Sequence, residues 1–172
     1  MNARPSHTTN IVFSLLPAAI WGALCLAIIL APLLQAGGHR PAAALFYMLF
    51  APVCHQDPAR SFALFGHAWA VCHRCSGIYF GLFLFAFFPW RLARIVPWRS
   101  RRRFWIAGGV APMALDIALN WAGLLANSAA SRFGTGLIFG AMLASLLGHA
   151  VKDLMSEIPR ARNQVVNASG GV

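Results

Sequence analysis

The fold is decided by the stretch CHQDPARSFALFGHAWAVCHRCSGIYFG, residues 54–81. Its polar part, the island of residues 54–75, holds three of the four cysteines and half of the six histidines, and apolar sequence flanks it on both sides. Soft ligands and fixed charge beside a membrane need partners, because an unpaired polar group is costly there. We therefore expect any activity of this protein to centre on the island.

The composition is typical of a membrane protein. Of the 172 residues, 59% are hydrophobic and only 10% are charged, whereas a soluble domain would carry about a quarter charged residues. The net charge of +10 is concentrated in one short connection between apolar segments, which is typical of a cytoplasmic loop facing anionic headgroups. The arginines of that loop are Arg91, Arg94, Arg99, Arg101, Arg102 and Arg103. We therefore expect the lipid bilayer, and no nucleic acid, as a partner.

The apolar runs predict an all-α fold, a polytopic transmembrane helical bundle of about five segments. The segments are 11–36, 41–53, 76–90, 104–126 and 134–151. They form a single transmembrane domain over residues 11–152, between a polar N-terminal tail at 1–10 and a flexible C-terminal tail at 153–172. Segment 41–53 is short, so it either spans with help from the island or is re-entrant. On segment 76–90, Gly77 and Gly81 form a small-residue face that allows close helix packing.

The distribution of basic residues orients the bundle in the plasma (inner) membrane. With five spans, an N-terminus outside and a cytoplasmic C-terminus put the arginine-rich loop and most other basic residues inside. If segment 41–53 is re-entrant, the first helix runs the other way. The island faces the outside in both cases.

The cysteines of the island have the spacing of a metal site. Cys72-His73-Arg74-Cys75 is a C-x-x-C motif just before a helix, and Cys54-His55 can add ligands from upstream. Because tetrahedral zinc needs about four N or S ligands, Cys54, His55, Cys72 and Cys75 are the predicted ligands of zinc or another transition metal. A disulfide or redox pair and unpaired packing thiols stay open as alternatives.

Four further residues are candidates for catalysis or binding: Asp116, Arg60, Arg74 and Arg132. Asp116 is an acid in the middle of a span, where a carboxylate either pairs with Arg74 or Arg132 or serves as a general base. The arginines either snorkel at helix ends or bind an anionic or lipid-linked ligand.

The island and later residues carry a family pattern. Its elements are Cys54-His55-Gln56, Arg60-Ser61-Phe62, Gly66, Cys72-x-Arg74-Cys75-Ser76-Gly77-Ile78-Tyr79-x-Gly81, Asp116 and Arg132-x-x-Thr135-Gly136. Over roughly residues 45–150 the chain resembles the uncharacterised prokaryotic membrane proteins grouped as domain of unknown function 2085. Ile117 stands where that pattern has glycine, and His73 where a small residue is usual. The resemblance implies an integral membrane protein with a shared polar site and supplies no activity.

Three functions follow from these residues. The leading one is a membrane protein with a Cys/His metal site at its outer face. The alternatives are a thiol–disulfide redox protein that uses the C-x-x-C pair, and an anion or lipid-headgroup binder or transporter that uses the arginines. The sequence decides neither whether the protein is an enzyme nor its oligomeric state.

Overall fold

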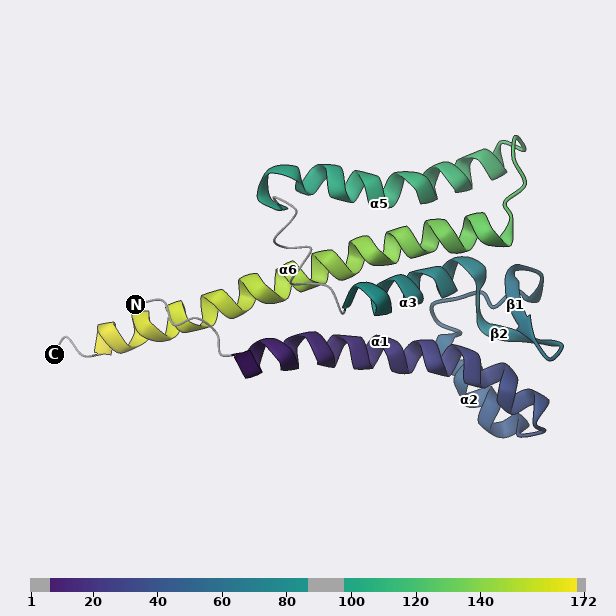
Figure 1. Cartoon of the computed structure of the whole chain (residues 1–172), viewed down its shortest axis with the longest axis horizontal. Helices are drawn as coiled ribbons and strands as arrows, with labels where there is room; N and C mark the ends of the chain where they lie inside the picture. The colour runs from purple at the N-terminus through teal and green to yellow at the C-terminus, as the bar shows by residue number, and fades with distance from the viewer. Residues whose placement is uncertain (1–6, 87–97, 170–172) are drawn as a thin grey trace.

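The computed structural model describes residues 7–86 and 98–169. Four helices lie side by side in the order α5, α6, α3, α1, and the shorter elements gather at one end of this bundle, which we call the hairpin end (Figure 1). The elements are α1 (His7–Ala36), α2 (Arg40–Phe50), η1 (Pro58–Arg60), β1 (Ser61–Leu64), β2 (His67–Cys72), α3 (His73–Ala86), α5 (Trp98–Trp121) and α6 (Ala129–Ser169). Arg91 and Arg94 of the predicted basic loop lie outside the described residues, as do 1–6 and 170–172.

The prediction of an all-α fold is wrong, because the island contains a β-hairpin. β1 and β2 pair antiparallel, with Leu64 opposite His67 and Ser61 opposite Cys72. The connecting residues Phe65 and Gly66 have φ angles of 52° and 80°. Two consecutive positive φ angles are those of a type I′ turn, whose twist matches that of paired strands. The hairpin delivers Cys72 directly to the start of α3.

The prediction of five transmembrane segments is also wrong. Within 7–86 and 98–169, two helices are long and apolar enough to cross a bilayer, Leu15–Ala36 and Ala129–Val151. Segment 41–53 became α2, whose 11 residues extend about 16 Å at 1.5 Å per residue, roughly half of the hydrocarbon layer. α5 is long enough to cross a bilayer, but polar residues such as Arg103 and Asp116 lower its mean hydropathy.

A tight turn folds α2 back onto the end of α1. Gly38 has a φ of 80°, and the His39 amide donates to the Leu34 carbonyl at 2.9 Å. This is the Schellman arrangement, in which a left-handed residue satisfies the last carbonyls of a helix. Pro41 then lies in the first turn of α2, where its missing N–H costs nothing.

Glycines bring α3 and α6 into backbone contact. A Cβ on Gly77 would overlap the carbonyl oxygen of Phe133, and a Cβ on Gly136 would overlap that of Arg74. Gly81 and Gly140 make the same kind of contact one turn further along. The small-residue face predicted from Gly77 and Gly81 therefore meets a second G-x-x-x-G face on α6, and close approach of this kind drives helix pairing in membranes.

α1 and α6 run in opposite directions, so the beginning of α1 and the end of α6 lie at the same end of the bundle (Figure 1). α6 remains helical as far as Ser169, through most of the region predicted to be a flexible tail. The flexibility of that tail stays a prediction.

Candidate metal centre

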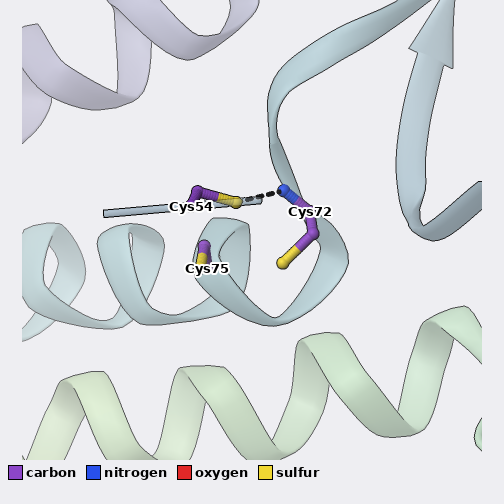
Figure 2. A group of neighbouring side chains, drawn as sticks. All are labelled: Cys54, Cys72 and Cys75. Atoms are coloured by element: carbon purple, nitrogen blue, oxygen red, sulfur yellow. Dashed lines mark hydrogen bonds between the residues drawn. The ribbon is translucent and has the colours of Figure 1, made fainter. Parts of the chain in front are cut away.

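Three of the four predicted ligands meet at the hairpin end. The sulfur atoms of Cys54, Cys72 and Cys75 all lie within 4.8 Å of one another. Cys54 comes from the turn after α2, Cys72 from the end of β2 and Cys75 from the first turn of α3, as Figure 2 shows. All three are free thiols in the structure. Three cysteines this close can share one metal ion.

A small apolar core fixes this meeting point. Cys54 is buried together with Ile28 and Ala31 of α1, Phe50 of α2 and Val71 of β2. Cys72 and Cys75 pack against the same cluster. The sulfurs are thus held by contacts from three directions, which favours a preformed site over one that assembles only when the metal arrives.

Backbone amides point at the sulfur of Cys54. The Cys72 amide donates to it at 3.3 Å (Figure 2), and the Gln56 amide donates at 3.5 Å. These two amides hold the Cys54 sulfur beside the first cysteine of the C-x-x-C motif.

Gln56 holds the loop that carries Cys54. Its side-chain nitrogen donates to the carbonyl of Tyr47 at 2.7 Å and to the carbonyl of Ala70 at 2.8 Å. These bonds join the end of α2 to β2 and keep Gln56 in the left-handed region, with φ 51°. Gln56 belongs to the family pattern, but its role could not be predicted from the sequence, because neither of its hydrogen-bond partners is close in sequence.

Cys72 and Cys75 behave as unequal partners of the C-x-x-C motif. The Cys75 thiol hydrogen bond lowers the pKa of Cys72 to about 5, and the backbone amides of Cys75 and Arg74 act in the same direction. The same thiol pair and burial raise the pKa of Cys75. Cys72 is therefore the thiolate of the metal-free site, and Cys75 keeps its proton.

His55, the fourth predicted ligand, is not part of this group. Its side chain is exposed, and its ring nitrogens are not among the ligand atoms that lie within 4.8 Å of one another. Adjacency to Cys54 in sequence suggested a shared site, but the chain turns at this point and presents consecutive side chains in different directions.

Asp116 forms a largely buried ion pair with Arg74. The two side chains approach to 2.6 Å and are 11% and 24% exposed, respectively. Asn127, in the α5–α6 connection, donates to the same carboxylate oxygen at 2.7 Å. The carboxylate thus joins α3, α5 and the connection that leads into α6. Pairing of Asp116 with Arg74 was one of the two predicted possibilities.

The predicted arginines do not converge on one point. Arg60 pairs with Asp57 at 3.2 Å on the exposed surface of η1, and Arg74 is taken by Asp116. Arg132 lies in the first turn of α6. Burial of His73 lowers the pKa of that histidine, and the charge of Arg132 lowers it further. His73 itself packs edge-on against Phe62 of the hairpin, with ring centroids 4.4 Å apart. This geometry does not form the arginine pocket that the sequence suggested.

Comparisons with known proteins agree with the membrane character. A family model described as "Predicted membrane protein (DUF2085)" matches residues 54–146, more than half of the chain. An uncharacterised protein of Methanocaldococcus jannaschii is 35% identical over 95 residues, covering 55% of this chain and 60% of that protein. An uncharacterised protein of Methanothermobacter thermautotrophicus is 31% identical over 107 residues, covering 60% of this chain and 95% of that protein. The match thus spans less than two thirds of the first relative, and no solved structure matches.

Proposed function

The chain belongs to the DUF2085 family of predicted membrane proteins, and we propose that it is a multi-pass membrane protein in which Cys54, Cys72 and Cys75 hold a transition metal ion, zinc. The proposal is carried by one observation, the three sulfurs that lie within 4.8 Å of one another. Thiolates bind zinc at about 2.3 Å, and binding would displace the proton that Cys75 keeps in the metal-free site.

A metal ion held by these three cysteines would keep a fourth coordination position for a ligand from outside the protein. Structural zinc sites usually have four protein ligands, whereas catalytic sites have three and keep one position for water or substrate. With His55 turned to the surface, three cysteines remain. The open position is where an anionic or lipid-linked ligand, or a water activated by the metal, would bind.

The metal centre faces the outside of the plasma membrane. Exposed Arg102 and Arg103 mark the opposite end of the bundle, at the beginning of α5 (Figure 1), and clusters of basic residues stay in the cytoplasm. Because the beginning of α1 and the end of α6 share that end, both belong on the cytoplasmic side. This replaces the N-terminus-outside arrangement, which depended on five spans.

Metal analysis combined with thiol counting tests the proposal. The chain purified in detergent under reducing conditions should carry about one zinc, and a Cys25→Ser variant, which removes the cysteine outside the centre, should carry as much. Cys54→Ser and Cys75→Ser variants should lose it. Wild-type protein without metal, or full retention of metal in both site variants, would overturn the proposal.

Thiol–disulfide exchange is a second candidate, and the lowered pKa of Cys72 favours it. In this case the Cys72 thiolate attacks a disulfide of a partner protein, and Cys75 then attacks the mixed disulfide, releasing the partner as a dithiol and leaving a Cys72–Cys75 disulfide. Thiol counting separates the candidates, because an oxidised sample would have lost two thiols that reduction restores, and would bind no metal.

A further inference from the structure

The outer face of α2 is apolar and uncovered. Leu45, Met48 and Leu49 lie on one side of this helix, with Val53 following it, and their exposed fractions are 69%, 68%, 54% and 63%, respectively. The opposite side, with Ala43 and Phe50, is buried against the protein. An apolar patch of this kind needs an occupant, because soluble surfaces rarely leave such groups in water.

α2 lies alongside a helix that can span the membrane. The turn at Gly38 folds it back along α1, and Phe50 packs in one buried cluster with Ile28 and Ala31. Both of these residues lie inside the apolar segment Leu15–Ala36. Ile28 precedes Ala36 by eight residues, about 12 Å at 1.5 Å per residue. The C-terminal end of α2, at Phe50, is therefore level with the interior of this apolar segment, and we call it the inner end of α2.

α1 also carries exposed apolar side chains. Leu26 and Leu33 are exposed on the segment Leu15–Ala36, where the surroundings of a spanning helix are lipid. No charged residue occurs between Arg40, at the turn, and Asp57, just before η1. The apolar face of α2 thus begins and ends at charges, as expected for a segment that enters a bilayer from one side.

The backbone at the inner end of α2 is satisfied within the protein. The Tyr47 carbonyl accepts from both the Ala51 amide and the Gln56 side chain, and the Tyr47 hydroxyl donates to the Ala68 carbonyl at 2.5 Å. Lipid offers no hydrogen bonds, so irregular backbone is tolerated at membrane depth only where the protein supplies the partners. The end of α2 meets this condition.

From these observations we infer that the outer face of α2 contacts the acyl chains of the leaflet on the hairpin side, and that α2 separates the cysteine centre from lipid. The occupant of the face is the bilayer itself. The centre is then reached from the hairpin rather than sideways through the membrane. This inference does not depend on which metal, if any, the cysteines bind.

Spin-label accessibility in liposomes tests the inference. A nitroxide is attached at Met48→Cys and, separately, at Leu45→Cys; both side chains are exposed, so neither variant opens the core. Leu26→Cys, on the apolar segment of α1, is the lipid control, and His39→Cys, in the turn, is the water control. The unmodified protein measures labelling of the native thiols and is subtracted.

The Met48 label should behave like the Leu26 label, with relaxation enhanced more by oxygen, which concentrates in lipid, than by a water-soluble nickel chelate. A stronger effect of the chelate, as at His39, would overturn the inference in favour of a water-facing helix. Insensitivity to both reagents would overturn it in favour of a protein cover, such as a second copy of the chain. If the native cysteines of the unmodified protein take up label, the result counts against the metal centre and not against the inference about α2. The α2 comparison is then made with Cys54, Cys72 and Cys75 changed to Ser, and the same outcomes decide it.

Discussion

Gln56 offers the sharpest test of how the protein holds its metal centre. Gln56→Ala removes the amide that bonds the carbonyls of Tyr47 and Ala70. Each such bond contributes about 0.5–1.5 kcal/mol, so losing both costs about 1–3 kcal/mol. The Tyr47 carbonyl keeps its bond from the Ala51 amide, which places the expected loss in the lower part of this range.

The loss should appear as weaker metal binding. Residue 56 keeps its left-handed backbone, φ 51°, only while the side chain is anchored. Once released, the loop can turn the residue 56 amide away from the Cys54 sulfur. Residues that position metal ligands typically change the metal affinity about 10–100-fold, and we expect the zinc affinity of Gln56→Ala to fall by a factor in this range. Gln56→Glu should bind zinc more weakly still, because it places a carboxylate against two carbonyl oxygens.

The assay is competition for zinc against a chromophoric chelator, with protein in detergent micelles and helicity followed by circular dichroism. Gln35→Ala, which removes the same side chain from α1 outside the Cys54 loop, is the matched control and should bind as wild type. If Gln56→Ala binds zinc as tightly as wild type while remaining folded, the anchoring role of Gln56 is refuted. An equal loss in the Gln35 variant would show that the effect is not specific to the loop.

Three further predictions concern the helices and the thiols. Gly136→Ala should weaken the α3–α6 contact and lower the melting temperature, because its Cβ would overlap the Arg74 carbonyl. Gly134→Ala is the control and should be neutral or slightly stabilising, because a Cβ at residue 134 meets nothing within 4 Å. Equal effects of the two variants in a melting experiment would contradict this packing. Asp116→Asn should destabilise the fold by up to about 3–5 kcal/mol, because Arg74 loses its charged partner. The folded variant should still bind metal. Loss of metal from a folded variant would show that Asp116 belongs to the metal centre. In metal-free, reduced protein the pKa of Cys72 is lowered to about 5, so its thiolate stays populated above that pH. Alkylation of Cys72, followed by mass spectrometry, should therefore remain fast at pH 6. An alkylation rate that already falls steeply below pH 8 would mean that Cys72 is an ordinary thiol.

The sequence located the centre but not the structure that holds it. The C-x-x-C spacing brings Cys72 and Cys75 together through one helical turn, a local rule that needs no knowledge of the fold. Cys54 joins them through the hairpin and the Gln56 bonds, which depend on contacts between residues 9 to 18 positions apart. His55 was expected at the centre because of its neighbour, and the direction of its side chain depends on a turn that spacing alone does not predict.

The number of spans was overestimated for a related reason. The apolar run 41–53 was counted as a segment that either spans or is re-entrant. Its 11 helical residues are too short to cross, and the Gly38 turn folds them against α1. The hairpin was missed because its strands are short and lie in a segment marked as polar by its ligands. Of the two glycine faces between α3 and α6, only Gly77 and Gly81 were recognised, since the matching Gly136 and Gly140 gain meaning only when the two helices are paired.

X-ray absorption at the edge of the bound metal tests the central claim most directly, because it counts the sulfur atoms around the ion. Three cysteines with an open fourth position predict three sulfur neighbours at about 2.3 Å and one nitrogen or oxygen neighbour, for zinc. The Cys54→Ser variant, if it still binds metal, should show one sulfur fewer, whereas Cys25→Ser should leave the spectrum unchanged. A shell of nitrogen and oxygen alone in the wild-type protein, or a spectrum that Cys54→Ser leaves unaltered, would contradict a metal centre built from Cys54, Cys72 and Cys75.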